Sequence, residues 1–395
     1  MSGSLEDSLR EWLTGRRAEH QFRERRISES PQQPVMRVEG RRLLAFCSND
    51  YLGLANHPLI VEAVIKGTRK WGVGAGASPL INGYGKAHQQ LEEEFAHFVA
   101  RPRALLFPSG YMANMGILAA LLSEGDEVLQ DRLDHASLAQ AGTLSGAHLS
   151  RYRHADPQSL LGELRKAGPG LRLVVTDGVF GIDGDLAPLA QIAEVCAASG
   201  AHLSVDDAHG FGVLGKSGCG TCELLGVQPD LLTCTLGNAL GTAGAVVAGS
   251  ETLIETLLQR APSYGYSTAL PAALAEGART ALRLLETEAW RRETVWALTE
   301  RFKAGARRLK LPLLESPTPI QPLLAGSSGQ ASRLSDALAK AGILVPAIRP
   351  PAVAEGQAKL RITLCAAHTT GHIDSLLSAL ADVWESHASE LDTGQ

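Results

Sequence analysis

The pattern of apolar and polar residues predicts that strands and helices alternate through the middle of the chain. Short apolar segments end in polar clusters, and most are followed by a segment with the apolar periodicity of a helix. The predicted strands cover 104–107, 127–130, 149–152, 171–176, 203–206 and 231–235, and helices are predicted from about 111, 136, 157 and 186. This alternation is typical of a largely parallel sheet with helices on both faces. We therefore predict an α/β fold.

The segments before and after this region have different patterns. Residues 5–26 are charged and helix-prone, which fits an arm that lies across another surface. Beyond Gly249, helices are predicted over 250–260, 271–288, 290–309, 331–341 and 370–384, with strands near 343 and over 360–364. The sequence thus predicts an N-terminal helical arm (1–42), a large α/β domain (43–285) and a smaller C-terminal α+β domain (286–395).

A glycine-rich loop interrupts the large domain within the segment 232–244. A β-rich run ends at Thr235, glycines follow at 237, 241 and 244, and an apolar run resumes at 245–247. Glycine permits positive φ values and a close approach of the backbone to a flat ligand. Asn238 lies in the middle of this loop, where a reactive side chain would be presented to such a ligand.

Composition narrows the possible partners and location. The chain has 395 residues, of which 45% are hydrophobic and 20% charged, and its net charge of -5 offers no basic surplus for nucleic acid. The first residues carry no apolar stretch that would indicate a signal peptide or a spanning helix, so we expect a cytoplasmic protein with reduced thiols. Cys219 and Cys222 form a C-x-x-C pair. Two unrelated loop thiols are favoured over a redox pair or half of a zinc site, because no second pair accompanies them.

Polar residues gather where the predicted parallel strands end, which is the edge at which such sheets bind ligands. Gly110 and Tyr111 end a strand and begin a helix, whose backbone N–H groups and dipole suit a phosphate. Asp206 ends another strand and could face a cationic ring nitrogen, although helix capping is the commoner role of such an aspartate. His135 could stack on an aromatic ligand, although a lone histidine is more often structural. Together with the glycine-rich loop, this order of features is typical of a pyridoxal phosphate site.

At this point the chain resembles the α-oxoamine synthases, a branch of the fold-type I pyridoxal phosphate enzymes. Within that branch it is most similar to the 8-amino-7-oxononanoate synthases of biotin synthesis, and the resemblance covers nearly the whole chain. The motifs that carry it are CSNDYLGLANHP (47–58), FPSGYMAN (107–114), DRLDHASL (131–138), VFGIDGDLAPL (179–189), VDDAHGFGVLG (205–215), YSTALP (266–271), VPAIRPP (345–351) and LRITL (360–364). Glycine-using relatives share most of these motifs, so another α-oxoamine synthase is an alternative.

The resemblance implies roles for individual residues. Gly110, Tyr111 and Thr235 would hold the phosphate, and His135 would stack on the pyridine ring. Asp206 would pair with the ring nitrogen and His209 with the ring hydroxyl. Arg361 would bind the amino-acid carboxylate, and Arg23 would lie near the acyl substrate. The implied substrates are L-alanine and a pimeloyl thioester of coenzyme A or an acyl-carrier protein, and the implied assembly is a homodimer.

Four positions depart from the family pattern. Asn238 stands where the family has the lysine that forms the Schiff base with the cofactor and moves protons at the substrate α-carbon. Gly181 replaces a serine near the cofactor, Ala352 a threonine that contacts substrate, and Cys219 an arginine. An asparagine amide is neither nucleophilic nor basic, so pyridoxal phosphate would be bound without covalent attachment.

Three hypotheses about function remain. The chain could be an 8-amino-7-oxononanoate synthase in architecture that is inactive or severely impaired, a non-catalytic binding or partner protein on the same scaffold, or an enzyme that retains slow chemistry with His209 or a water moving the proton. The first is favoured, and the third is the weakest.

Overall fold

The computed structural model describes Ser4–Leu391, so residues 1–3 of the predicted arm and residues 392–395 of the predicted C-terminal domain lie outside the described part. The chain divides into two compact units. The large unit contains residues 49–181 and 185–293, and the small unit contains residues 1–48, 182–184 and 294–395. The predicted arm and the C-terminal region therefore belong to one unit, and residues 182–184 join that unit from within the α/β region.

The large unit is built on a seven-stranded sheet with the order β3-β9-β8-β7-β6-β4-β5. The neighbours from β8 to β5 are parallel, whereas β9 runs antiparallel to both β3 and β8. The largely parallel sheet is thus confirmed. The strands are β3 (Arg103–Phe107), β4 (Glu127–Asp131), β5 (His148–Tyr152), β6 (Arg172–Asp177), β7 (His202–Asp206), β8 (Leu231–Thr235) and β9 (Ala245–Gly249).

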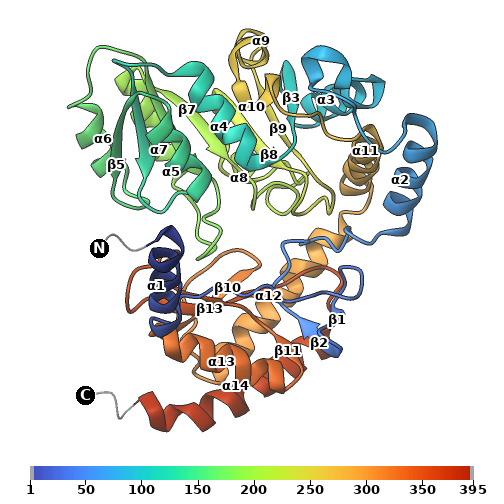
Figure 1. Cartoon of the computed structure of the whole chain (residues 1–395), viewed down its shortest axis with the longest axis vertical. Coiled ribbons are helices and arrows are strands. Elements are labelled where there is room, and N and C mark those ends of the chain that lie inside the picture. The colour runs from blue at the N-terminus through green and yellow to red at the C-terminus, as the bar shows by residue number, and fades with distance from the viewer. Residues whose placement is uncertain (1–3, 392–395) are drawn as a thin grey trace. The chain divides into compact units, whose positions relative to one another are not determined.

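Successive residues along the central strands are buried alike, which shows that both faces of this sheet are covered. Helices form that cover. On one face, strand residues such as Val175 and Val247 pack with Ile117 and Leu257 of two helices in a single apolar cluster. In Figure 1, α2 lies beside α11 within this unit, and the two helices are in contact. The helices are α2 (Pro58–Trp71), the π-helical turn η1 (Pro79–Gly83), α3 (Lys86–Phe98), α4 (Gly110–Leu121), α5 (Ala136–Leu144), α6 (Pro157–Leu164), α7 (Leu189–Ser199), α8 (Thr221–Leu225), α9 (Glu251–Arg260), α10 (Pro262–Gly265) and α11 (Ala272–Thr287).

The small unit contains two three-stranded sheets with the orders β1-β2-β11 and β10-β13-β12. Its core packs residues such as Phe302, Leu334, Leu360 and Leu376 from the helices and from β13. The elements are α1 (Leu5–Ala18), β1 (Val35–Val38), β2 (Arg41–Ala45), β10 (Ile320–Gly326), α13 (Ser328–Lys340), β11 (Ile343–Leu344), β12 (Ala347–Ile348), β13 (Ala358–Thr363) and α14 (Thr370–Leu391), and α12 (Trp290–Arg308) begins in the large unit.

The predicted N-terminal helix over 5–26 is too long, because α1 ends at Ala18. His20 takes a left-handed φ of 54°, which ends the helix. Ser4 caps the other end through a capping box with Asp7. The strand β1 was not predicted, although it pairs with β2 as a hairpin. Within the described residues, no helix is both long and apolar enough to cross a membrane.

Candidate functional site

Asn238 lies in the loop between β8 and β9 and is tied to the backbone of the neighbouring loop. Its side-chain amide nitrogen donates a hydrogen bond to the carbonyl oxygen of Ala208 at 2.8 Å. Ala208 follows β7 by two residues, so this bond links the two adjacent loops at the carboxyl edge of the sheet. The predicted glycine loop is therefore confirmed as a connection between two strands, and its central side chain points toward the polar residues that follow β7.

The glycines of this loop fix its path. Gly241 has a φ of 61°, and a Cβ atom there would collide with the backbone nitrogen of Ala55. Leu236 N donates to Gly244 O at 2.9 Å, and Thr242 N donates back to Leu236 O at 2.9 Å. The loop is thus a tightly bonded turn that holds Asn238 in one place.

Asp206, the last residue of β7, is a buried carboxylate with two donors. Asn114 of α4 donates its amide nitrogen to Oδ2 at 2.6 Å, and Ala208 N donates to Oδ1 at 3.0 Å. Burial raises the pKa of Asp206, and the hydrogen bonds from Asn114 and Ala208 and the charge of His135 oppose that rise. A carboxylate that is desolvated in this way gains most from a cationic partner, which a protonated pyridine nitrogen would supply.

The adjacent Asp207 has a different role. It accepts hydrogen bonds from the backbone nitrogen of Thr221 at 2.7 Å and from the hydroxyl of Thr221 at 2.5 Å, at the start of α8. Burial raises its pKa to about 7. The capping role that the sequence also allows for Asp206 is thus taken by its neighbour Asp207, while Asp206 accepts from the side chain of Asn114.

His135 begins α5 and faces outward from the sheet edge. Its Nδ1 lies 2.7 Å from the hydroxyl of Ser137, and its backbone nitrogen donates to Asp177 at 2.7 Å. Asn114 also donates to Ser137, at 2.9 Å, so His135 and Asp206 are connected through Ser137 and Asn114. The ring is exposed, as a group that stacks on a ligand requires.

His209 is hydrogen-bonded to the buried Tyr51. The hydroxyl of Tyr51 lies 2.8 Å from Nδ1 of His209, and the two rings meet edge to face. Gly181 gives the histidine room, because a Cβ atom at Gly181 would overlap Nε2 of the His209 ring. The serine that the family pattern has at this position could not occupy it without displacing His209 from its present place.

The amino end of α4 is where the sequence predicts the phosphate site. Ser109 is the N-cap and accepts a hydrogen bond from Met112 N at 3.2 Å, and Gly110 is the first helical residue. Tyr111 is 43% exposed, and its hydroxyl donates to Gln140 of α5. Thr235 ends β8, and its hydroxyl accepts from Gly237 N at 3.3 Å. The first-turn N–H groups of a helix have no intrahelical partner and are available to an anion.

The three predicted substrate residues belong to the small unit. Arg361 lies in β13, is buried, and donates to the hydroxyl of Thr363 at 3.0 Å. Arg23 is exposed and follows α1, and Ala352 lies in an exposed turn where its backbone nitrogen donates to Arg349 O at 3.1 Å. Their predicted roles toward substrate stay predictions.

Comparison with known proteins identifies the family. The family model for aminotransferases of class I and II matches residues 41–380. The chain belongs to this family. Within it, the chain falls in the α-oxoamine synthase branch. The 8-amino-7-oxononanoate synthase of Thioalkalivibrio sulfidiphilus is 55% identical over 376 residues, covering 94% of this chain and 96% of the relative. That of Cellvibrio japonicus is 51% identical over 391 residues, covering 98% of each chain.

Solved structures agree with this assignment and show the fold-type I architecture. A lysine-to-alanine variant of serine palmitoyltransferase from S. paucimobilis, solved with a bound PLP–myriocin aldimine, has a TM-score of 0.92 at 27% identity and covers 97% of this chain and 98% of its own. The 8-amino-7-oxononanoate synthase from Francisella tularensis has a TM-score of 0.76 at 31% identity and covers 88% of this chain and 99% of its own.

The groups at this edge of the sheet fit noncovalent binding of pyridoxal phosphate. The residue at position 238 does not fit covalent attachment. The amino end of α4 suits the phosphate, the buried carboxylate of Asp206 suits a protonated ring nitrogen, and His209 has the room beside Gly181 to reach a ring substituent. The amide of Asn238 cannot form an imine, and its nitrogen is already bonded to Ala208. The residues at this edge would hold and orient the cofactor without a covalent bond to it.

Two residues that position the site had no role in the sequence-based prediction. Asn114 holds Asp206, and Tyr51 holds His209. Asn114 is one polar residue in the otherwise apolar helix 110–121, which is a signal that could have been noticed. Tyr51 gave no such signal, because it lies 158 positions from its partner.

Cys219 and Cys222 are free thiols, as the sequence predicts. The thiol of Cys219 donates to Phe98 O at 3.2 Å, and burial raises the pKa of both thiols. No group of three or more His, Cys, Asp or Glu side chains in the described part of the chain is arranged to hold a metal ion. Within the described residues, the pair therefore has no further ligands beside it that would complete a zinc site.

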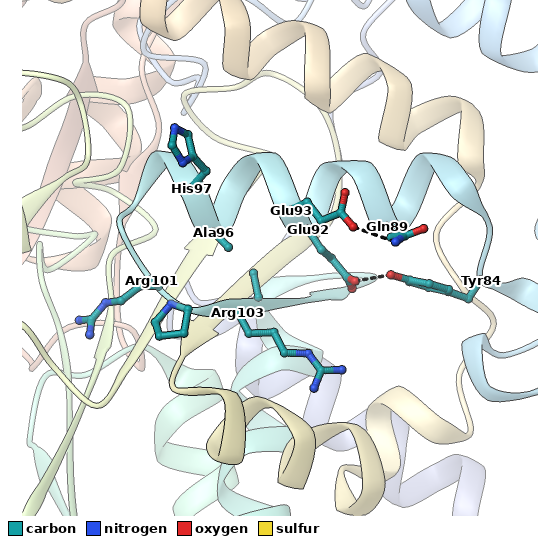
Figure 2. Close-up of a pocket in the computed structure, with 10 residues that line it drawn as sticks. Tyr84, Gln89, Glu92, Glu93, Ala96, His97, Arg101 and Arg103 are labelled. Carbon is teal, nitrogen blue, oxygen red and sulfur yellow. Dashed lines mark hydrogen bonds between the residues drawn. The ribbon is translucent and has the colours of Figure 1, made fainter.

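A separate cavity of about 490 Å³ lies beside α3 and the edge strand β3. Figure 2 shows Tyr84 reaching the carboxylate of Glu92 at its margin, with Glu93 bonded to Gln89 nearby. The second oxygen of Glu92 accepts from Leu106 N at 2.8 Å. None of the predicted cofactor or substrate residues lines this cavity. Glu92 instead connects Tyr84, in the segment before α3, to Leu106 of the edge strand β3.

Proposed function

We propose that this chain is an 8-amino-7-oxononanoate synthase in architecture and ligand binding that is inactive or severely impaired in catalysis. Its identity of 50 to 55% with curated enzymes of that name, over nearly their full lengths, supports the ligand set. The single observation that carries the impairment is the Asn238 amide at the position of the family lysine, bonded to Ala208 O. The ligands are pyridoxal phosphate, L-alanine and a pimeloyl thioester.

The chain's own residues would perform binding and orientation. Backbone N–H groups of Gly110 and Tyr111, with Thr235, would hold the phosphate, and His135 would stack on the ring. Asp206 would keep a proton on the ring nitrogen, and His209 would face the ring hydroxyl. Pyridoxal phosphate, when bound, supplies the electron sink for breaking bonds at the amino-acid α-carbon.

Asn238 removes two functions from this arrangement. It cannot anchor the cofactor, and it cannot take or return a proton at the substrate α-carbon. Loss of general acid–base catalysis alone costs about 10²- to 10⁴-fold in rate. The lysine-to-alanine variant of serine palmitoyltransferase that holds a PLP–myriocin adduct supports the view that this fold binds cofactor and ligand together without a lysine at one altered position. Arg361 would bind the alanine carboxylate, and a homodimer is part of the proposal because family sites are built at the dimer interface.

Equilibrium binding of two ligands tests this function. Pyridoxal phosphate and the stable adduct phosphopyridoxyl-L-alanine would each be titrated into the protein, and tryptophan fluorescence or calorimetry would report binding. We expect both to bind, with the adduct binding more tightly because it also engages the substrate residues. Absence of binding by either ligand would refute the proposed ligand set and favour a non-catalytic partner protein on this scaffold.

Turnover is measured separately, by release of thiol from pimeloyl-coenzyme A in the presence of L-alanine. We expect no release above background over many hours. Release at the rate of an ordinary synthase would refute the impairment while leaving the ligand set intact.

A further inference from the structure

His154 lies in the turn between β5 and α6 and is bonded to a carboxylate on each side. Its Nδ1 is 2.9 Å from Oδ1 of Asp131, and its Nε2 is 2.8 Å from Oδ2 of Asp185. Ionised carboxylates only accept hydrogen bonds, so both ring nitrogens must donate and the ring is an imidazolium. Burial on its own lowers the pKa of His154, but the hydrogen bonds and charges of Asp131 and Asp185 outweigh it and raise the pKa to about 9.

The Asp131 end of this bridge is rigid. Asp131 is the last residue of β4, which has β5 on one side and β6 on the other. Its carboxylate also accepts from Leu133 N at 2.9 Å and from Ala155 N at 2.7 Å. Asp134, Asp177 and Tyr152 are the other titratable groups whose pKa values are raised by the charge of Asp131. The histidine is thus held at a fixed point on the sheet edge.

The Asp185 end belongs to a hairpin loop. Residues Val179 and Leu186 form an isolated antiparallel bridge, and Phe180 N donates to Asp185 O at 3.0 Å. The ring of Phe180 meets the His154 ring edge to face at 4.4 Å. Among the described residues, none donates a hydrogen bond to the buried Oδ1 of Asp185. The hydrogen bond from His154 to Oδ2 is therefore the one that ties this carboxylate to the β5–α6 turn.

The same hairpin carries Gly181, whose missing side chain leaves the room that the His209 ring fills. Gly181 directly follows Phe180, so a movement of the hairpin changes the space around His209. This connects His154 to the cofactor residues through the backbone of one short loop.

We propose that His154 is a positioning residue, a protonated clasp that holds the two arms of the hairpin, Gly178–Gly181 and Asp185–Ala187, against the sheet and thereby sets the place of Gly181 beside His209. The consequence for cofactor binding rests on the proposed function, whereas the clasp itself does not. The clasp is closed while His154 is protonated and opens as the pH rises through about 9.

Hydrogen exchange in the ligand-free protein tests the clasp directly. The His154→Gln variant would be compared with wild type and with His148→Gln, a matched control that removes an exposed histidine paired with Glu127 on the adjacent strand. The amides of residues 179–181 and 185–187 would be followed by mass spectrometry at pH 7. We expect exchange to be faster by about 10²-fold in His154→Gln, the factor that corresponds to the two units between pH 7 and a pKa of about 9, and unchanged in His148→Gln. Equal exchange in all three proteins would overturn the proposal.

A second variant distinguishes loss of the clasp from general unfolding of the protein. Asp185→Asn keeps a hydrogen-bond acceptor beside Nε2 but removes the charge, so the pKa of His154, followed by NMR of the imidazole, should fall by at least about one unit. An unchanged pKa would also overturn the proposal.

The effect of His154 on the cofactor site is then measured as the affinity of the protein for pyridoxal phosphate. His154→Gln should bind it more weakly than wild type at pH 7, by about tenfold, and the two should converge above pH 10. Equal affinity at pH 7 would remove the positioning role. A wild-type protein that binds no pyridoxal phosphate would refute the proposed function, and the exchange experiment would still decide the clasp.

Discussion

The side-chain nitrogen of Asn238 lies 2.8 Å from the carbonyl oxygen of Ala208, two residues beyond the buried carboxylate of Asp206. The residue at the family's lysine position is therefore bonded to the loop that carries the expected partners of the cofactor ring. Around it, Asp206 is hydrogen-bonded to Asn114, and His209 is hydrogen-bonded to Tyr51. The proposed function predicts that binding and catalysis can be separated at this one side chain.

Asn238→Lys should restore covalent attachment of pyridoxal phosphate. The loop that presents position 238 is fixed by its own hydrogen bonds and by Gly241, so a lysine there starts from the same backbone. We expect a visible absorption band on addition of the cofactor. Borohydride should abolish this band and leave the cofactor permanently attached to the protein. Asn238→Ala is the matched control and should give no band.

A colourless Asn238→Lys protein would mean that other changes, such as Gly181, have altered the pocket. Thiol release from pimeloyl-coenzyme A should rise by at least about 10²-fold in this variant if the remaining residues are competent. Binding of cofactor without any gain in release would place the second defect on the substrate side.

Tyr51→Phe should weaken cofactor binding while leaving the fold intact. The change removes the hydroxyl that lies 2.8 Å from Nδ1 of His209, and a hydrogen bond of this kind contributes about 0.5 to 1.5 kcal/mol. We expect the dissociation constant for pyridoxal phosphate to rise by about 2- to 10-fold. Tyr264→Phe, at a tyrosine that is also buried but packs against Phe107, is the control and should leave the affinity unchanged. An equal loss in both variants would point to packing and not to His209.

The sequence predicted the sheet well because its strands are marked by local patterns. Most of the parallel strands are apolar runs that end in a polar cluster, so Asp206 and His135 could be placed at the same sheet edge from the sequence. Glycine spacing likewise marked the loop that holds Asn238. The prediction of a helix over 5–26 was too long for a local reason as well. The charged, helix-prone pattern continues past His20, where the backbone leaves the helical conformation.

The partners of these residues could not be predicted in the same way. Asn114 is 92 positions from Asp206, and His154 is 31 positions from Asp185, so their pairing depends on which strands become neighbours. Gly181 was recognised as a departure from the family pattern, but its reason is the position of the His209 ring, which only the packed structure provides. Long-range polar contacts of this kind are set by topology and not by sequence spacing.

Glu92→Gln should stabilise the protein above neutral pH. Burial raises the pKa of Glu92 to about 7, against the hydrogen bonds from Tyr84 and Leu106. A carboxyl whose folded pKa is raised binds more protons in the folded state, so wild-type stability should fall as the pH rises from about 4.5 to 7. Glutamine can accept from Leu106 N and donate to Tyr84 without a charge. At pH 8 we expect a gain of up to about 3 kcal/mol in the free energy of unfolding.

Urea unfolding at pH 5 and pH 8 measures this effect. Glu93→Gln, which removes the same charge from the exposed neighbouring residue, is the control and should show little pH-dependent difference from wild type. A gain for Glu92→Gln that is the same at both pH values would contradict the titration of Glu92.

Asp206→Asn should make the ligand-free protein more stable and weaken its binding of pyridoxal phosphate. The carboxylate is buried, and its pKa is raised by desolvation, so its ionised form lowers the stability of the ligand-free protein increasingly as the pH rises above about 4. Asparagine is nearly the same size and removes the cost of a buried charge, although its single amide oxygen can accept from only one of the two donors at its present place, Asn114 Nδ2 or Ala208 N. We expect urea unfolding of the ligand-free variant at pH 8 to require a higher denaturant concentration than wild type.

Cofactor binding by Asp206→Asn should change in the opposite direction. A neutral amide does not stabilise a protonated ring nitrogen, so affinity for pyridoxal phosphate should fall by at least about tenfold, or about 1.4 kcal/mol. Asp207→Asn is a matched control for the binding step, because Asp207 bonds to Thr221 at the start of α8 and not to the site. If Asp206→Asn is less stable than wild type and still binds cofactor normally, Asp206 serves the fold, and the cofactor ring must be held by other residues.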